Sequence, residues 1–108
     1  MAESTDVVQG TLDMLILKSL SLQPTHGFGV TKRIEQISDG VFRVNPGSLL
    51  LAFQRMERDG LITAEWAASE NNRRAKYYAI TAKGRKRLKA DTSDWVRRAA
   101  AIARLLEA

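Results

Sequence analysis

Residues 45–80 read NPGSLLLAFQRMERDGLITAEWAASENNRRAKYYAI, and this stretch decides the fold. Asn45 suits an N-cap, and Pro46 suits the first helical position because its missing N–H would have no partner there. Asp59-Gly60 ends the predicted helix, with Gly60 placed for a left-handed residue after the C-cap. One helical face carries the apolar residues Leu49, Ala52, Phe53 and Met56.

Two strand-like runs follow that helix, at residues 61–68 and 76–80. In the first run apolar and polar residues alternate, as in a half-buried strand. The connection, residues 69–75, is polar and long for a tight turn. Basic residues surround it: Arg73, Arg74 and Lys76. A helix followed by a basic hairpin, in a small chain, is the layout of a winged-helix DNA-binding domain.

The composition narrows the function classes. The 108 residues fit one domain, and a net charge of +5 with a pI of about 10.0 favours a polyanion partner without establishing one. There is no cysteine and one histidine, which argues against disulfides and metal sites, and no cofactor is expected. No apolar run approaches the roughly 20 residues that span a bilayer. The polar residues 1–6 do not resemble a signal peptide, so we expect a cytoplasmic protein without membrane contact.

Two helices are predicted ahead of this stretch. Residues 8–22 are apolar around so much of the helix that we expect burial on more than one side, partly by a second subunit. Residues 1–7 are expected to form a loose arm. Residues 27–38 form the second helix, with Val30, Ile34 and Ile37 facing the core. Residues 41–44 are β-prone and are a candidate third strand for the hairpin.

A second strong pattern lies in the last helix, which Thr81 should cap and which should run to about Leu106. Its apolar positions follow a heptad spacing: Leu88, Thr92, Trp95, Ala99, Ile102 and Leu106. We interpret this as an inter-subunit seam; the alternative is an amphipathic helix packed on its own domain. The predicted dimer interface comprises Leu12, Leu15, Leu88, Trp95, Ala99, Ile102 and Leu106.

The predicted architecture is therefore mainly α with a small β-hairpin. Residues 1–81 form a winged helix-turn-helix and residues 82–108 a long C-terminal dimerisation helix, together one compact unit. Eight of the 17 Lys and Arg residues fall in residues 81–108, so the basic character is not confined to the predicted reading head. Trp66 and Trp95 are expected to pack in the core, with a pocket at the dimer interface as the alternative.

The exposed face of the helix that begins at Pro46 is a candidate for reading bases. It holds Gly47, Leu51, Gln54, Arg55 and Arg58, with Ser48 and Leu50 at its margins. Donors and cations of this kind suit a recognition helix, although a solvated polar face is the plainer alternative. Two leucines directed away from the core leave apolar surface in water, which is unfavourable unless a partner covers it. A thymine methyl and a neighbouring protein surface are the two candidates.

The hairpin has a similar pair of interpretations. Its basic residues either form a solvated turn or lie along the DNA backbone or in the minor groove. Tyr77 and Tyr78 point to opposite faces, so one belongs to the core and the other offers its hydroxyl to a phosphate or to water. His26 is the sole candidate for catalysis, and a lone histidine is more often structural. Gly27-Phe28-Gly29 is too short for a nucleotide-binding signature, so an enzyme is not expected.

Several motifs together resemble the PadR family of bacterial transcriptional regulators. They are Gly10-Thr11-Leu12-Asp13-Met14-Leu15-Ile16-Leu17, His26-Gly27-Phe28-Gly29-Val30, Pro46-Gly47-Ser48-Leu49, Met56-Glu57-Arg58-Asp59-Gly60-Leu61-Ile62, Arg73-Arg74-Ala75-Lys76-Tyr77-Tyr78 and Thr81-Ala82-Lys83-Gly84-Arg85. The resemblance implies a winged helix-turn-helix repressor, dimeric through its C-terminal and first helices, on palindromic operators. It also implies that some members respond to small aromatic or hydrophobic effectors. The chain is similar to the short subfamily, which has one C-terminal helix rather than a separate C-terminal domain.

The chain departs from the family pattern at three positions. Leu50 and Leu51 stand where the usual pattern has Tyr and Pro, and Phe28 stands where it has Tyr. The lost tyrosines are of the kind that donate hydrogen bonds to DNA phosphates, each contributing about 0.5–1.5 kcal/mol. Their loss implies weaker binding or a shift of preference toward thymine methyls.

The leading hypothesis is a homodimeric, sequence-specific DNA-binding repressor. Its expected DNA contacts are Phe28, Lys32, Gly47, Ser48, Leu50, Leu51, Gln54, Arg55, Arg58, Arg73, Arg74, Lys76 and Tyr77. The alternative is a protein-interaction or ligand-sensing winged-helix module with weakened DNA binding, which Phe28, Leu50 and Leu51 motivate.

Overall fold

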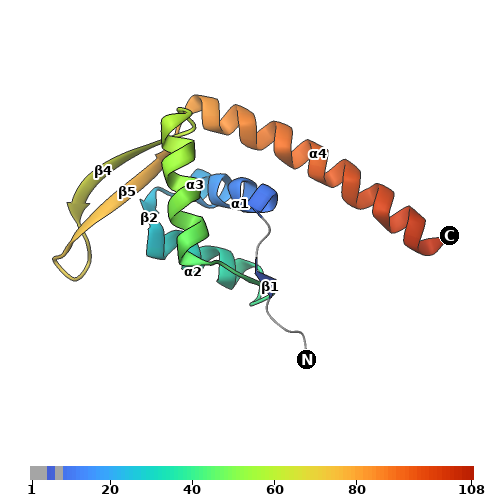
Figure 1. The fold of residues 1–108 in the computed structure, drawn as a ribbon, viewed down its shortest axis with the longest axis horizontal. Helices are drawn as coiled ribbons and strands as arrows, with labels where there is room; N and C mark the ends of the chain where they lie inside the picture. The colour runs from blue at the N-terminus through green and yellow to red at the C-terminus, as the bar shows by residue number, and fades with distance from the viewer. Residues whose placement is uncertain (1–4, 7–8) are drawn as a thin grey trace.

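The computed structural model describes residues 5–6 and 9–108, and Figure 1 shows their arrangement. The helices are α1 (Gln9–Leu22), α2 (Gly27–Ile37), α3 (Pro46–Arg58) and α4 (Ala82–Glu107). The strands are β1 (Thr5–Asp6), β2 (Thr25–His26), β3 (Phe42–Arg43), β4 (Ile62–Ala68) and β5 (Arg74–Ile80). An antiparallel sheet in the order β2-β5-β4 lies beside the first three helices, which is the winged-helix arrangement that the sequence predicts.

Helix α3 forms as its sequence predicts. The Asn45 carboxamide oxygen accepts a hydrogen bond from the Ser48 N–H at 3.1 Å, and Pro46 is the first helical residue. At the other end Gly60 adopts φ +76°, and the Leu61 N–H donates to the Met56 carbonyl at 2.9 Å. Both helix ends therefore satisfy backbone groups that would otherwise lack partners.

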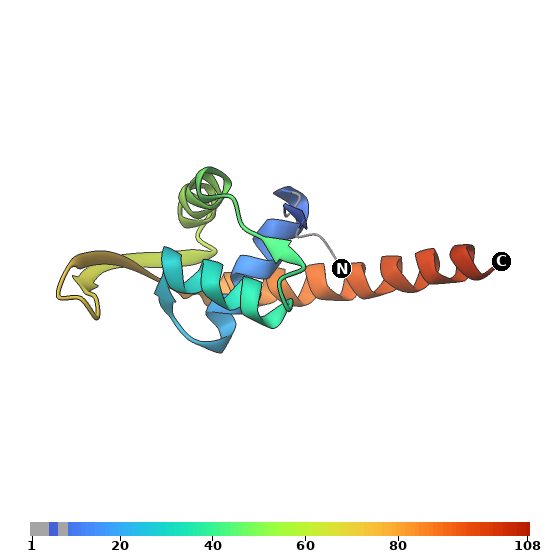
Figure 2. The same ribbon diagram turned by 90° about the horizontal axis from the view of Figure 1, so that it is seen from below.

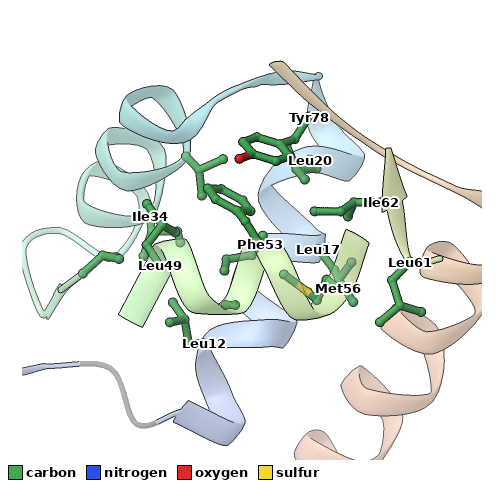
Figure 3. Packing of buried hydrophobic residues seen from close by; sticks show 14 residues of the cluster. Leu12, Leu17, Leu20, Ile34, Leu49, Phe53, Met56, Leu61, Ile62 and Tyr78 are labelled. Carbon is green, nitrogen blue, oxygen red and sulfur yellow. The ribbon is translucent and has the colours of Figure 1, made fainter. Parts of the chain in front are cut away.

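The core lies between α1, α2, α3 and the base of the hairpin, as the close view in Figure 3 shows. The rings of Phe53 from α3 and Tyr78 from β5 stack with 3.9 Å between their centroids. This contact holds the hairpin against the helix that precedes it. The core also includes Leu12, Ile16, Leu17, Leu20, Val30, Ile34, Leu49, Met56 and Ile62.

The third strand of the hairpin sheet is not the predicted one. Residues 42–43 pair in parallel with β1, whereas β2 pairs with β5 through Thr25 opposite Tyr78. The reason is the path of the chain: helix α2 lies between β2 and β3 and carries residues 42–43 away from the hairpin (Figure 1). The short segment between α1 and α2 remains beside β5 and completes the sheet.

The predicted burial of Ile37 and Trp66 is wrong. Ile37 is 69% exposed because it is the last residue of α2, beyond the end of the core. Trp66 is 56% exposed because the hairpin extends past α3, and only its base, with Ile62 and Tyr78, is buried. In both cases the sequence period predicts which side of the element faces the core. How deeply a side chain is buried depends instead on where the neighbouring element ends.

Helix α4 begins against the domain and then leaves it. The Thr81 hydroxyl accepts the Gly84 N–H at 3.0 Å, as predicted, and Leu88 packs against the core. The rest of the helix projects from the body in both views, and the molecule measures 54 × 35 × 21 Å (Figures 1 and 2). Its radius of gyration of 15.0 Å exceeds the value of about 13 Å for a compact chain of this length.

The projecting half of α4 is apolar on one side. The exposed side chains there include Trp95, Val96, Ile102, Leu105 and Leu106. The prediction that Trp95 packs in the core is therefore wrong for the single chain. Leu12, predicted at a dimer interface, is 1% exposed inside its own domain, so that prediction is also wrong. Leu15 is half-buried and still accessible.

Candidate nucleic-acid interface

The start of α2 is fixed by His26. Its imidazole Nδ1 accepts the Gly29 N–H at 3.0 Å and so caps the helix, which gives the chain's one histidine a structural role. The His26 ring also meets Tyr77 edge-on at 5.2 Å, so the cap is tied to the hairpin. Phe28, on the first turn, is 70% exposed, and the Lys32 ammonium lies 5.9 Å from its ring centroid. Both residues were predicted to contact DNA, and both are accessible.

The outward face of α3 contains most of the predicted reading residues. Leu50 and Leu51 are 53% and 64% exposed, so both leucines lie outside the core as predicted. The other exposed positions on this helix from the predicted set are Gly47, Ser48, Gln54 and Arg58.

Arg55 is placed differently from its prediction. Its guanidinium forms an ion pair with the Asp13 carboxylate of α1 and is partly buried. The predicted place of Arg55 on the face opposite the core is therefore wrong, and its contact with DNA stays a prediction. A helical wheel puts Arg55 at the edge of the outward face, where a long side chain can turn inward to a carboxylate 42 residues earlier in the chain.

The hairpin presents its cations on the face that meets α3. In the β4–β5 register Ala64 lies opposite Tyr78, Trp66 opposite Lys76 and Ala68 opposite Arg74, so these side chains share one face. Tyr78 is the member buried against α3, and Lys76 forms an ion pair with Glu57 of α3 at 3.3 Å. Arg74 lies over the Trp66 ring at 5.2 Å from its centroid.

The tip of the hairpin is shorter than predicted. Strand β5 begins at Arg74, so the connection is residues 69–73 rather than 69–75. The Ser69 N–H donates to the Arg73 carbonyl at 2.6 Å and the Asn72 N–H to the Ser69 carbonyl at 2.9 Å. Asn72 takes φ +59°, a conformation that asparagine tolerates better than most residues. Arg73 and Arg74 are both exposed.

The two tyrosines separate as predicted. Tyr78 is 6% exposed, and burial raises the pKa of its hydroxyl, although the nearby Lys76 ammonium opposes this shift. Tyr77 is half-buried on the opposite face and donates its hydroxyl to the Ala68 carbonyl at 3.4 Å. Its predicted hydrogen bond to a phosphate would have to replace or share this contact.

A groove of about 800 Å³ unites these elements. Its lining includes Phe28 and Lys32 from α2, Leu50 from α3, and Lys76 from β5. Residues distant in the sequence thus form one concave surface with apolar and cationic parts. Glu70 of the hairpin tip also lines it and is the acidic member of the lining. Arg58, Arg73 and Arg74 are exposed on the elements around the groove.

One residue of this surface escaped the sequence prediction. Trp66 was assigned to the core, but it stands exposed beside Arg74 on the cationic face of the hairpin. The pairing register of the hairpin carries the relevant signal. A tryptophan is near enough to interact with an arginine that lies two residues from the tryptophan's cross-strand partner. Among the described residues no group of three or more His, Asp or Glu is arranged to hold a metal ion. No helix in the described part of the chain has the length and apolarity to cross a membrane.

Comparison with known proteins agrees with this geometry. The family model described as "Transcriptional regulator PadR-like family" matches residues 16–90. A transcriptional regulator from Clostridium thermocellum is similar in structure, with a TM-score of 0.80 and 28% identity over 89% of this chain and 93% of that one. A PadR-like transcriptional regulator from Bacillus cereus has a TM-score of 0.79 and 26% identity over 93% and 95% of the two chains. An uncharacterized protein from Lysinibacillus sphaericus is 26% identical over 91 residues, 84% of each chain.

Proposed function

The chain belongs to the PadR-like family of transcriptional regulators, and from this premise we propose that it is a repressor that binds a palindromic operator as a homodimer. The family and the named solved relatives are transcriptional regulators rather than enzymes. The observation that carries the proposal is the shared surface of α2, α3 and the hairpin. It presents exposed cations on both sides of an accessible helix face.

The surface divides into two kinds of contact. Lys32, Arg58, Arg73 and Arg74 are exposed cations that suit phosphates, which position a protein on DNA without reading its sequence. The first half of α3 is the part that enters the major groove in a helix-turn-helix, and it contributes Gly47, Ser48, Leu50 and Leu51. Trp66 lies beside these phosphate contacts, because the Arg74 guanidinium is over its ring.

The projecting half of α4 supports the proposed homodimer. Apolar side chains exposed there would be covered if a second copy packed against the same helix, and a two-fold interface covers both copies at once. Leu15 of α1 is accessible to extend that interface, and Trp95, Ala99, Ile102 and Leu106 form its seam, whereas Leu88 of the predicted seam packs on its own domain. A two-fold dimer also presents two α3 helices, which is why the operator should be an inverted repeat.

A gel-shift titration against the DNA upstream of the protein's own gene tests this function. We expect saturable binding that weakens steeply with salt and that survives an excess of competitor DNA. Binding that competitor DNA abolishes at every salt concentration would contradict a sequence-specific regulator.

A second candidate is a protein-interaction or ligand-sensing module. The exposed Phe28, Leu50 and Leu51 favour it, since they present apolar surface where a DNA-binding face is normally polar. A small aromatic or hydrophobic effector would find an apolar hollow of about 140 Å³ between α1 and α2, lined by Leu15, Leu22, Ile37 and Phe42. Replacing Arg73 and Arg74 with alanine separates the candidates, because an interaction module would be indifferent to the change.

A further inference from the structure

We propose that Leu50, Leu51 and Gln54 read A·T base pairs in the major groove, the leucines by packing against thymine methyl groups and Gln54 by pairing with adenine. This proposal rests on the proposed function and names the bases that the same surface selects. It gives a role to two leucines that the fold leaves uncovered.

The packing of α3 directs Leu50 and Leu51 away from the core. Leu49, Ala52, Phe53 and Met56 already fill the inner face of α3, and each is at most 7% exposed. Rotating α3 to bury its other face would expose this packed one, so the core packing fixes the orientation of the helix. Leu50 and Leu51 therefore stay in water until a partner covers them, at an unfavourable hydration free energy.

Leu50, Leu51 and Gln54 lie together on the outward face of α3. Gln54 follows Leu50 by four residues and Leu51 by three, so all three side chains lie over adjacent positions of one face. Gly47 lies one turn earlier on that face and has no side chain, which leaves room for a close approach. Gln54 is exposed, and its carboxamide forms no hydrogen bond with any of the described residues.

The chemistry of this face matches one base pair best. In the major groove thymine alone presents a methyl group, and leucine can cover it. Adenine presents an N7 acceptor and an N6 donor side by side, which a glutamine carboxamide can engage in two hydrogen bonds. A face with two leucines and one glutamine, and with no cation at its centre, suits A·T pairs rather than the O6 and N7 acceptors of guanine.

The charges around the face favour DNA over a protein partner. Lys32, Arg58, Arg73 and Arg74 are exposed on α2, α3 and the hairpin around it. Covering the leucines with an apolar protein surface would bring these cations against that partner too, whereas the DNA backbone supplies a phosphate for each of them. The occupant that satisfies both the apolar centre and the cationic rim is a DNA duplex.

Removal of single methyl groups from the DNA tests the proposal directly. Binding sites are first selected from random duplexes with the full-length protein, and each thymine of a half-site is then replaced by uracil, which lacks only the 5-methyl group. We expect A·T pairs in the selected half-site and about a fourfold loss of affinity at one or two thymines. This factor corresponds to the burial of one methyl-sized group. Uracil outside the half-sites should change nothing.

Protein variants complete a double-mutant cycle. Leu50→Ala and Leu51→Ala should lose affinity for the thymine site and should no longer distinguish thymine from uracil at the contacted position. Val41→Ala is the matched control, because Val41 is 44% exposed between α2 and β3, outside every proposed contact, and should keep the fourfold preference. Since the leucines are exposed, both variants should fold, which circular dichroism checks; the uracil series on the wild type needs no variant.

The outcomes separate the two levels of the proposal. Specific binding to a selected site with equal affinity for thymine and uracil at every position would overturn the A·T proposal and leave the regulator intact. Failure to select any site would overturn both. Oligomers larger than a dimer that disappear on Leu50→Ala or Leu51→Ala would assign the leucines to a protein contact and would also overturn the proposal.

Discussion

Single cations at the hairpin tip should control how strongly the protein binds DNA of any sequence. Each of Arg73→Ala and Arg74→Ala should weaken binding about equally for all sequences and should lower the slope of log K against log salt by about 1. Fluorescence anisotropy at several salt concentrations measures both quantities. Arg104→Ala is the control, since Arg104 is exposed on α4 away from the candidate nucleic-acid interface. An unchanged slope in both hairpin variants would exclude phosphate contacts there.

Trp66 offers a spectroscopic test of the same face. The chain has two tryptophans, so Trp95→Phe leaves Trp66 as the sole emitter. Because operator binding should remove the ring from water, iodide quenching of Trp66 should fall and its emission should shift to shorter wavelength. Trp66→Phe, which reports Trp95 alone, should show no change on adding DNA. Equal quenching of Trp66 in the free and bound protein would place the ring outside the contact.

At the residue scale, the sequence predicts which way a side chain points better than how deeply it is buried or which residues it contacts. The inner face of α3 and the separation of Tyr77 from Tyr78 follow from periodicity alone. The predicted burial of Trp66 and Ile37 is wrong, because burial depends on where neighbouring elements end. The inward turn of Arg55 depends on Asp13, a partner 42 residues away that no local pattern reveals.

The junction of α4 with the hairpin should be intolerant of any side chain at Gly84. A Cβ there would lie 2.1 Å from the Leu61 carbonyl oxygen, which is backbone and cannot move aside. We expect Gly84→Ala to lower the free energy of unfolding by about 1–3 kcal/mol or more, as overpacking does. Gly27→Ala is the control, because its Cβ would meet Phe53 at an ordinary 3.5 Å. Urea denaturation measures both, and equal midpoints would contradict the packing described.

The stacked contact between β5 and α3 should make stability fall at high pH. Burial raises the pKa of Tyr78 in the folded protein above the unfolded value of about 10. Above pH 10 the unfolded chain therefore binds fewer protons than the folded one, and the free energy of unfolding decreases as pH rises through the folded pKa. Tyr78→Phe should reduce this decrease. Urea titrations of the wild type and the variant at about pH 9 and 10.5 test this, and an equal decrease of the free energy of unfolding in both would contradict it.

At the element scale, all four helices are predictable to within a residue or two, because caps, Pro46 and Gly60 mark their ends in the sequence. The short strands are not. Pairing of β2 with β5 and of β3 with β1 is set by how α2 carries the chain across the domain. A two-residue strand has too few side chains to specify its partner by pattern.

At the scale of the whole molecule, the exposed seam on α4 should determine the assembly. Ile102→Glu combined with Leu106→Glu places charges on two apolar positions that are 56% and 82% exposed. Like charges facing each other across a two-fold axis should convert the dimer to the 12.0 kDa chain in sedimentation velocity. Operator affinity should fall at least about tenfold, since two half-sites no longer act together. Arg104→Ala should remain dimeric, and a dimeric double variant would refute the seam.

The heptad spacing predicts that α4 has a partner, yet it does not show how much of the helix its own domain covers. Leu88 contacts the core of its own domain, whereas Trp95 and Leu106 do not, a division set by where the domain ends. The class of the protein and most of its candidate interface are therefore predictable from the sequence. The fold is needed to tell which part of α4 packs on its own domain and which part is left for a second copy.

Footprinting of the protein on the DNA upstream of its own gene tests the central claim most directly. We predict protection of an inverted repeat whose half-site centres lie roughly one helical turn, about 10 base pairs, or a multiple apart, with one dimer bound per site. Protection should disappear in the Arg73→Ala, Arg74→Ala double variant at physiological salt. Uniform, unprotected cleavage at protein concentrations that saturate non-specific binding, or one isolated half-site occupied by one chain, would contradict the account.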